Sequence, residues 1–473
     1  MPNSQYDVVI IGTGPGGYVA AIRAAQLGLK TAVIEKDELG GTCLNWGCIP
    51  TKSWIVTAHL YEQIKRAKEF GIIVGEPQID WAALVSRKNK IVKQLTGGVK
   101  QLLAGRQVDI LKGTARLTSA NRVAISGGAG GATELTADNV ILATGAYSWM
   151  PPGWSLDGER VIDSKGALDL TKQPKRIAIL GGGVIGCEFA CFFAAIGSQV
   201  TVVEMLPRLV MAEDEEVSAA LEREMKKQKI ALHLGTKVED RRDNGDGSIT
   251  LTLAGGKTVD VDCVLLATGR RPYSEGLGLE TVGISRADRG KIAVNDRLQT
   301  SSPNVYAIGD VTDIKQLAHF ASAQGKAAAE IIAGHAAQTN WRAVPAATFT
   351  TPEIASVGIT EAEAKAEGRN VKVGRFPFRA HGRNIADAET AGFVKIVGDA
   401  DTGQVLGTTI FGAKASELIH EASLAIGADL DVSAIAQAIH AHPTMTEALG
   451  EAAEDADGLA IHLLRTEAKV GAK

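Results

Sequence analysis

Two cysteines five positions apart are the residues of this chain best suited to redox chemistry. Cys43 and Cys48 lie in the stretch GGTCLNWGCIPTK (40–52) and are two of only five cysteines. On an ideal helix, residues five apart differ by about 7.5 Å in axial rise, more than the roughly 7 Å Cα separation of an unstrained disulfide. A bond between them therefore needs a distorted turn, which Gly47 permits, and should be easily reduced. The alternative is a pair of unrelated buried thiols.

A dinucleotide-binding pattern comes just before the cysteines. The apolar segment 6–11 predicts a buried parallel strand, and GTGPGG (12–17) joins it to a helix expected from Tyr18 to Leu27. A second apolar strand, 31–34, ends in Glu35. This order is the fingerprint of a site for a dinucleotide pyrophosphate, and the acid can accept a hydrogen bond from a ribose hydroxyl. The glycines of the pattern are Gly12, Gly14 and Gly17.

The same pattern recurs after residue 176. The acid follows the first glycine by 23 positions in both copies, Glu35 after Gly12 and Glu204 after Gly181. A carboxylate at Glu204 favours NAD, since it would repel the 2′-phosphate of NADP. Arg208 argues partly against this preference, and a solvated charge at a strand end is the alternative for Glu204. The glycines of this copy are Gly181, Gly183 and Gly186.

Composition limits the classes of function. The 473 residues allow two to four domains, and 45% hydrophobic with 22% charged residues is typical of a soluble globular protein. A net charge of −4 gives no electrostatic reason to bind nucleic acid or a membrane. No apolar run approaches the roughly 18 residues of a membrane-spanning helix. Because the first strand is expected by residue 6, we expect no targeting peptide and a cytoplasmic protein.

The cysteine stretch and the fingerprint before it resemble those of the class I pyridine nucleotide–disulfide oxidoreductases, and within that family those of the dihydrolipoamide dehydrogenases. Later motifs extend the resemblance over essentially the whole chain. The resemblance implies FAD and NAD as cofactors, with no metal ligands. It implies an α/β fold with two Rossmann-like dinucleotide-binding domains and a C-terminal α+β dimerisation domain. The expected divisions are an FAD-binding domain (1–150), an NAD-binding domain (151–272), a second FAD-binding or central part (273–343) and the interface domain (344–473).

Several shorter motifs carry the resemblance beyond the fingerprints. Two Ala-Thr-Gly turns, containing Thr144 with Gly145 and later Gly269, are expected to close the two nucleotide-binding sheets. A strand ending in Gly309 and Asp310 is expected to approach the flavin's ribityl chain and phosphates, although Asp310 could instead cap the helix predicted at 317–333. In the motif Leu317-Ala318-His319, the flavin is expected near Ala318. Gln324 stands at a position where an acid is expected. The segments 375–383 and 412–417 also resemble the family.

The candidate base lies in IHAHPTMTE (439–447). Thr444 to Glu447 has the pattern of a helix capping box. Functionally, His442 is a base oriented by Glu447 through its other ring nitrogen, and the match to the family's HPT-x-x-E favours this second interpretation. His440 is expected to be structural.

The resemblance also implies a mechanism. His442 deprotonates dihydrolipoamide, whose thiolate attacks the outer Cys43, and Cys48 leaves as a thiolate against the flavin. Lys52 is expected near the flavin N5 region, with Glu188 as its ion-pair partner. The nicotinamide accepts hydride on the opposite flavin face. In a homodimer, each cysteine pair is expected to take its base from the other subunit.

The expected partners are the lipoyl domains and acyltransferase core of 2-oxoacid dehydrogenase complexes, or the lipoylated protein of glycine cleavage. The alternative is an NAD(P)H-dependent reductase of the glutathione or mercuric reductase type. Glutathione reductases have Tyr where Val184 stands and arginines after the second strand, and mercuric reductases have a C-terminal cysteine pair that 465–473 lacks. A flavin-bound redox sensor or scaffold would not need His442 and Glu447.

Overall fold

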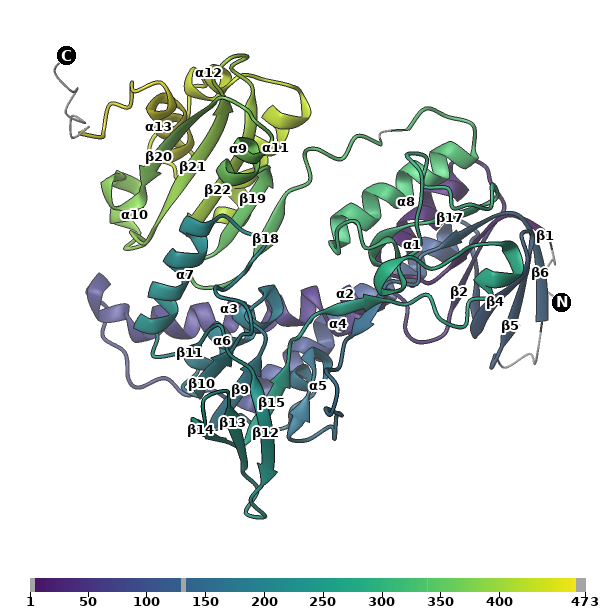
Figure 1. Cartoon of the computed structure of the whole chain (residues 1–473), viewed down its shortest axis with the longest axis horizontal. Coiled ribbons are helices and arrows are strands. Elements are labelled where there is room, and N and C mark those ends of the chain that lie inside the picture. Colours follow the sequence, from purple (N-terminus) through teal and green to yellow (C-terminus); the bar gives the residue numbers. More distant parts are fainter. Residues whose placement is uncertain (1–4, 129–132, 338, 465–473) are drawn as a thin grey trace. The chain divides into compact units, whose positions relative to one another are not determined.

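The computed structural model describes residues 5–128, 133–337 and 339–464 (Figure 1). The tail at 465–473, in which the sequence has no cysteine, lies outside the described residues. The chain forms two units, each made of two separate segments: Met1–Pro174 with Cys263–Thr339, and Lys175–Asp262 with Asn340–Lys473.

The first unit is built on a mostly parallel sheet with strand order β3-β2-β1-β6-β5-β4, in which β17 also pairs with β6. All five residues of β2 are buried, as expected for a parallel strand covered on both faces. The antiparallel β4–β5 hairpin extends the sheet beyond β6. The strands are β1 (Gln5–Ile11), β2 (Thr31–Glu35), β3 (Asp109–Lys112), β4 (Thr114–Ser119), β5 (Arg122–Ser126), β6 (Thr133–Leu142) and β17 (Val305–Ala307).

Helices α1 (Pro15–Gln26) and α8 (Ala318–Ile332) pack closely against each other (Figure 1). A Cβ at Gly325 of α8 would lie 2.4 Å from the Gly16 carbonyl oxygen, so only glycine allows this approach. The other elements of the unit are α2 (Gly41–Asn45), α3 (Cys48–Lys65), η1 (Ala67–Phe70), α4 (Trp81–Gly105), β7 (Ala146–Ser148), β8 (Val161–Ile162), α5 (Ser164–Leu168), β15 (Cys263–Leu266), β16 (Arg270–Pro272), η2 (Leu279–Val282), η3 (Asp288–Gly290) and η4 (Gly309–Thr312).

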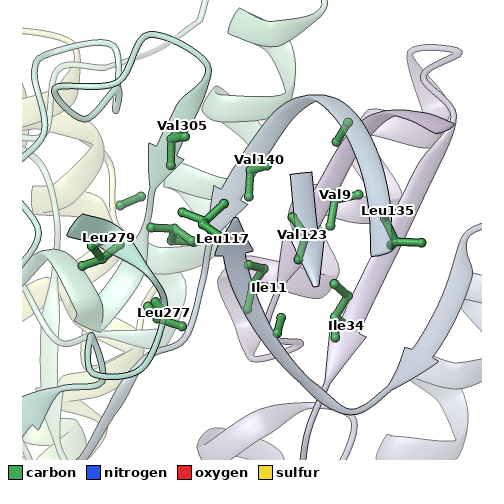
Figure 2. Close-up of a cluster of buried hydrophobic side chains, with 14 of the residues drawn as sticks. Val9, Ile11, Ile34, Leu117, Val123, Leu135, Val140, Leu277, Leu279 and Val305 are labelled. Atoms are coloured by element: carbon green, nitrogen blue, oxygen red, sulfur yellow. The ribbon is translucent and has the colours of Figure 1, made fainter. Parts of the chain in front are cut away.

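The core of this unit fixes the strand that leads to the first glycine loop. Figure 2 shows side chains from β1, β2 and β6 beside those of the β4–β5 hairpin and of the segment around Leu277 and Leu279. The backbone N–H of Leu117 donates to the Leu277 carbonyl, which joins this late segment to β4. The labelled residues are all buried: Val9, Ile11, Ile34, Leu117, Val123, Leu135, Val140, Leu277, Leu279 and Val305.

The second unit contains the second βαβ arrangement. Three parallel strands run in the order β11-β10-β9, and α6 connects β9 to β10. An antiparallel sheet, β12-β13-β14, follows in the chain. These elements are β9 (Arg176–Leu180), α6 (Val184–Ala195), β10 (Gln199–Val203), α7 (Glu215–Lys227), β11 (Ala231–His233), β12 (Val238–Asp243), β13 (Ile249–Leu253) and β14 (Thr258–Val261).

An antiparallel sheet of order β18-β19-β22-β21-β20 forms the C-terminal part of the same unit. Buried side chains of the sheet and of α11–α13 form one core, and a Cβ at Gly374 would lie 1.9 Å from the Ala452 carbonyl oxygen. The elements are β18 (Ala346–Thr348), β19 (Ile354–Gly358), α9 (Glu361–Ala366), β20 (Val371–Pro377), η5 (Phe378–Ala380), α10 (Gly382–Ala386), β21 (Gly392–Asp399), β22 (Val405–Gly412), α11 (Ala415–Gly427), α12 (Val432–Ala436) and α13 (Glu447–Ala456).

A buried ion cluster joins α7 to this C-terminal sheet. Lys395, whose side chain is 3% exposed, lies 2.8 Å from Asp214, 2.7 Å from Glu216 and 2.9 Å from Glu361. Arg375 shares Glu216 at 2.6 Å. Because Asp214 is itself buried, Lys395 is the cation that balances its charge inside the protein.

The predicted α/β class is confirmed, with a mostly parallel sheet in the first unit and an antiparallel C-terminal sheet in the second. Strand β4 is not predicted from the sequence, because Thr114–Ser119 has only two buried apolar side chains. In the part of the chain that the structure describes, no helix is both long and apolar enough to span a bilayer.

Candidate active site

The two cysteines lie on either side of a break between two helices. Cys43 belongs to α2, Cys48 begins α3, and Gly47 between them has φ −133° and ψ −114°. A Cβ at Gly47 would lie 2.8 Å from the Thr42 carbonyl oxygen, so the break needs glycine. The distorted turn expected from the spacing is therefore present.

Both sulfurs are half-buried thiols in this structure. The hydrogen bond with Cys48 raises the pKa of Cys43, burial raises it further, and Lys52 partly opposes both. Cys43 therefore holds its proton more tightly than an ordinary thiol does. Lys52 lies one helical turn after Cys48 on α3.

The first glycine loop has the shape of a phosphate cradle. Gly12 has φ +99°, and a Cβ there would lie 2.4 Å from the Ala143 carbonyl oxygen. A Cβ at Gly17 would lie 2.0 Å from the Gly12 carbonyl oxygen. A Cβ at Gly14, the N-cap of α1, would meet no atom within 4 Å, so the helix N-terminus opens onto free space. This arrangement fits a dinucleotide pyrophosphate.

Glu35 is held against the same loop. Its Oε2 accepts hydrogen bonds from the Thr13 N–H at 2.9 Å and the Thr13 hydroxyl at 2.6 Å, and Oε1 accepts from the Asp37 N–H at 2.8 Å. The carboxylate is thus fixed at the carboxyl end of β2, where the fingerprint places the ribose.

Each Ala-Thr-Gly turn is hydrogen-bonded to the residue that follows the short strand after the other turn, a reciprocal pattern that the sequence did not reveal. The Thr144 hydroxyl donates to the Tyr273 carbonyl at 2.6 Å, and the Tyr273 N–H donates to the Gly145 carbonyl at 2.8 Å. Equivalently, Thr268 donates to the Trp149 carbonyl, and the Trp149 N–H donates to Gly269. The first turn therefore anchors the end of β16, which follows the second turn, and the second turn anchors the end of β7, which follows the first.

Asp310 is not a helix cap, so that alternative is wrong. The N-cap of α8 is Leu317, Ala318 is the first helical residue, and Asp310 lies in η4. Gly309 has φ +71° and donates its N–H to Gln324 Oε1 at 2.7 Å. The amide at 324 therefore fills the acceptor role of the expected acid.

Arg270 is a site residue that sequence reasoning missed, although it directly follows the second Ala-Thr-Gly turn. Its Nη2 donates to the Ala146 carbonyl and lies 3.5 Å from Thr42 Oγ1, next to Cys43. Burial lowers the pKa of Arg270, and the charge of Asp310 opposes that shift. Burial likewise raises the pKa of Asp310, with Arg270 opposing. Arg270 and Asp310 therefore place two opposite charges near α2, the helix that contains Cys43.

The second glycine loop repeats the cradle. A Cβ at Gly186 would lie 1.9 Å from the Gly181 carbonyl oxygen, and Gly183 has open space in front of it as the N-cap of α6. Glu204 accepts hydrogen bonds from the Gly182 N–H at 2.5 Å and the Leu206 N–H at 2.7 Å. The acid is therefore fixed beside the loop, as Glu35 is in the first copy.

Arg208 is bound within its own loop. The guanidinium donates to the Glu213 carbonyl at 2.8 Å, the Ser218 hydroxyl at 2.7 Å and the Met211 carbonyl at 3.0 Å. These three neutral acceptors hold it in place. This weakens the argument that Arg208 would receive a 2′-phosphate.

Glu188 lies on α6 and is 4% exposed. Its Oε1 accepts the Phe349 N–H at 2.9 Å, which ties α6 to the segment after β18. Lys52 belongs to the other unit, and the ion pair between the two residues stays a prediction.

His442 and Glu447 form a hydrogen-bonded pair. His442 Nδ1 lies 2.9 Å from Glu447 Oε1, and the His442 side chain is 81% exposed, which leaves Nε2 available to a substrate. Burial raises the pKa of Glu447, but hydrogen bonds from His442 and from the Thr444 N–H outweigh it, so this pKa lies below its usual range. An ionised carboxylate therefore faces the imidazole.

The capping-box alternative is realised only in part. Glu447 Oε2 accepts the Thr444 N–H at 2.9 Å. However, α13 begins at Glu447 with Thr446 as N-cap, and no side chain caps it. His440 is bonded to Glu421 at 3.0 Å, as expected for a structural histidine.

Comparison with known proteins gives consistent matches over the whole chain. The family model described as pyridine nucleotide-disulphide oxidoreductase matches residues 6–325, and the model of the family's dimerisation domain matches 344–453. Dihydrolipoyl dehydrogenase of Geobacillus stearothermophilus is 43% identical over 97% of this chain and 98% of its own length. The enzyme of the same name from Bacillus subtilis is 42% identical over 98% of both chains.

Solved structures agree in fold at lower identity. LpdA from Mycobacterium tuberculosis has a TM-score of 0.89 and 28% identity, over 96% of this chain and 99% of its own. The HOCl-induced flavoprotein disulfide reductase RclA from Escherichia coli has a TM-score of 0.85 at 29% identity, over 95% and 99% of the two chains.

Proposed function

Because the chain belongs to the pyridine nucleotide-disulphide oxidoreductase family, whose cofactors are FAD and NAD, we propose that it oxidises dihydrolipoamide to lipoamide with NAD as acceptor. The observation that carries the proposal is the pair of His442 and Glu447, 2.9 Å apart. A dithiol substrate must lose a proton before it can attack a disulfide, since the free thiol has a pKa of about 8.5.

The side chains support the following steps. His442 Nε2 takes the proton of one substrate thiol, and the charge of Glu447 stabilises the imidazolium. The substrate thiolate attacks the sulfur of Cys43, the Cys43–Cys48 bond breaks, and Cys48 receives its electron pair. The second substrate thiol, once deprotonated, attacks the mixed disulfide and releases lipoamide, leaving both cysteines reduced.

The glycine cradles support the positions of both cofactors. FAD would be held by Gly12, Gly14, Gly17 and the N-terminus of α1, with Glu35 at its ribose. NAD would be held by the equivalent loop before α6, with Glu204 at its ribose. When bound, FAD would supply a two-electron acceptor for the reduced cysteines, and NAD would supply the final hydride acceptor. Lys52, beside the cysteines, would contribute a positive charge there.

A homodimer is supported by the dimerisation-domain match at 344–453. We propose that His442 of one subunit serves the cysteine pair of the other. Large apolar side chains in the same region are uncovered in the single chain: Ile439 is 101% exposed and Leu424 is 70% exposed. Exposed large apolar side chains in a dimerisation domain are expected of a surface that a second subunit covers. The domain divisions after residues 150, 272 and 343 remain part of the proposal.

The lipoyl domains of 2-oxoacid dehydrogenase complexes, or the lipoylated glycine cleavage protein, are the proposed macromolecular partners. The test of function is a comparison of steady-state rates with dihydrolipoamide and NAD against glutathione disulfide and NADPH. We expect the first pair to give the higher kcat/KM by orders of magnitude. Faster turnover of glutathione disulfide would support the reductase alternative instead.

A further inference from the structure

Glu447 faces a second histidine besides His442. The Nε2 atom of His381 lies 3.7 Å from Glu447 Oε2, while His442 Nδ1 lies 2.9 Å from Oε1. His381 is buried, with 8% of its side chain exposed, and it packs edge-on against Phe376. One carboxylate therefore has an imidazole hydrogen-bonded to one oxygen and a second imidazole 3.7 Å from the other.

The tautomer of His381 follows from its other neighbours. His381 Nδ1 lies 2.6 Å from Asn384 Oδ1, and the Asn384 amide donates to the Glu389 carbonyl at 3.1 Å. Because that amide nitrogen is a donor, Oδ1 is the acceptor and His381 Nδ1 carries a hydrogen. In neutral His381, Nε2 then has only a lone pair to turn toward Glu447. Protonation at Nε2 replaces that lone pair with an N–H directed at the carboxylate.

We propose that His381 is a positioning residue for Glu447. The protonated ring of His381 would compete with the protonated ring of His442 for electrostatic stabilisation by the Glu447 carboxylate. The proposal rests on the proposed function only in taking His442 as the base. When His381 is protonated, Glu447 stabilises the His442 imidazolium less, so His442 stays neutral to lower pH. The expected result is a base that works over a wider pH range than a single imidazole–carboxylate pair.

The other groups around this pair are accounted for by their own partners. His381 faces Asn384 on α10, the Phe376 ring on β20 and Glu447 on α13. Glu447 also accepts the Thr444 N–H. Among the described residues, a further titratable group near the carboxylate is His462, whose pKa is raised by its 2.5 Å bond to Glu451 and less strongly by Glu447.

His381→Asn tests the proposal, because asparagine retains an N–H for Asn384 but does not titrate. The matched control is His440→Asn, which removes a histidine bonded to Glu421. Two readouts are taken as a function of pH: kcat/KM for dihydrolipoamide, and the rate at which diethylpyrocarbonate modifies His442, followed by mass spectrometry. The reagent attacks only neutral imidazole and needs no substrate.

In the wild type and in His440→Asn, we expect the acid limb of both profiles to be shallower than a one-proton curve. In His381→Asn, we expect a one-proton limb and a loss of about threefold near pH 6, with an unchanged plateau at pH 8.5. Profiles that superimpose, or a loss equal at every pH, would overturn the proposal. If His381→Asn fails to fold, His381→Gln is measured in its place.

The two readouts separate this inference from the proposed function. A wild type that does not turn over dihydrolipoamide contradicts the proposed function, whereas the modification profile of His442 still decides the competition. A wild type that turns over dihydrolipoamide with a modification profile unaffected by His381→Asn contradicts the inference alone.

Discussion

Replacement of Glu204 by alanine should lower the preference for NAD over NADP. The carboxylate is fixed by two backbone N–H groups, from Gly182 at 2.5 Å and Leu206 at 2.7 Å. Each oxygen keeps acceptor capacity for a ribose hydroxyl. One charge-assisted hydrogen bond contributes roughly 1.5–3 kcal/mol, so its loss should reduce kcat/KM for NAD by about 10- to 150-fold.

The effect of Glu204→Ala on kcat/KM for NADP should be smaller than its effect on kcat/KM for NAD, or opposite in sign. Removal of the carboxylate also removes its repulsion of the 2′-phosphate, so kcat/KM for NADP should stay level or rise. Arg208 should not add to NADP binding, because its guanidinium is bound to Glu213, Ser218 and Met211.

The assay is the steady-state oxidation of dihydrolipoamide with either nucleotide, at saturating dithiol. Glu215→Ala, which removes an acid from the first turn of α7, is the control for a change in net charge. An unchanged ratio of the two kcat/KM values in Glu204→Ala would show that the acid is only a surface charge, and the fingerprint argument for NAD would fail.

Four further predictions concern the dimer, the second glycine loop and, in two cases, the ion cluster. Co-expression of Cys43→Ala with His442→Ala should restore activity to about a quarter of wild type, because about half of the dimers are hybrids with one intact site; recovery no greater than either single variant, with hybrids present, would place base and cysteines in one chain. Gly186→Ala should abolish NAD binding, since its Cβ would lie 1.9 Å from the Gly181 carbonyl oxygen, whereas Gly97→Ala, with no atom near its Cβ, should leave binding intact in isothermal titration. Lys395→Met should lower the free energy of unfolding by about 3–5 kcal/mol by leaving buried Asp214 unpaired. Lys226→Met, which removes an exposed lysine paired with Glu222, should cost little; equal urea midpoints for the two variants would contradict this. In the same cluster, hydrogen bonding to Lys365 lowers the pKa of Glu361 to about 2; Lys395 adds to this shift, and burial opposes it. The contribution of ionised Glu361 to stability, which is present above about pH 4.5, should therefore be lost as pH falls toward 2.

The local patterns of the sequence predicted the elements that carry the chemistry. Apolar runs and glycine spacing indicated both βαβ arrangements, because Gly17 and Gly186 are each required by a close approach to the first glycine of their own loop. The break at Gly47 followed from the geometry of a helix and a disulfide. The pair of His442 and Glu447 followed from residues five apart in the chain.

Contacts between distant segments could not be predicted in this way. The reciprocal bonds between the two Ala-Thr-Gly turns join residues more than a hundred positions apart. Arg270 meets Thr42, and His381 meets Glu447, only after the chain has folded. The sequence pattern also allowed Asp310 to be a helix cap, because an acid before a helix has the same local signature in either role.

The most direct test of the central claim is to follow the two cysteines through the half-reactions. The oxidised, flavin-loaded protein is treated without oxygen with one equivalent of dihydrolipoamide and then with NAD, with alkylation and mass spectrometry after each step. We predict that Cys43 and Cys48 resist alkylation at first, that both become alkylated after dihydrolipoamide, and that both are protected again after NAD, with about one NADH formed per pair. NADH formation while either cysteine keeps one state throughout would contradict the account.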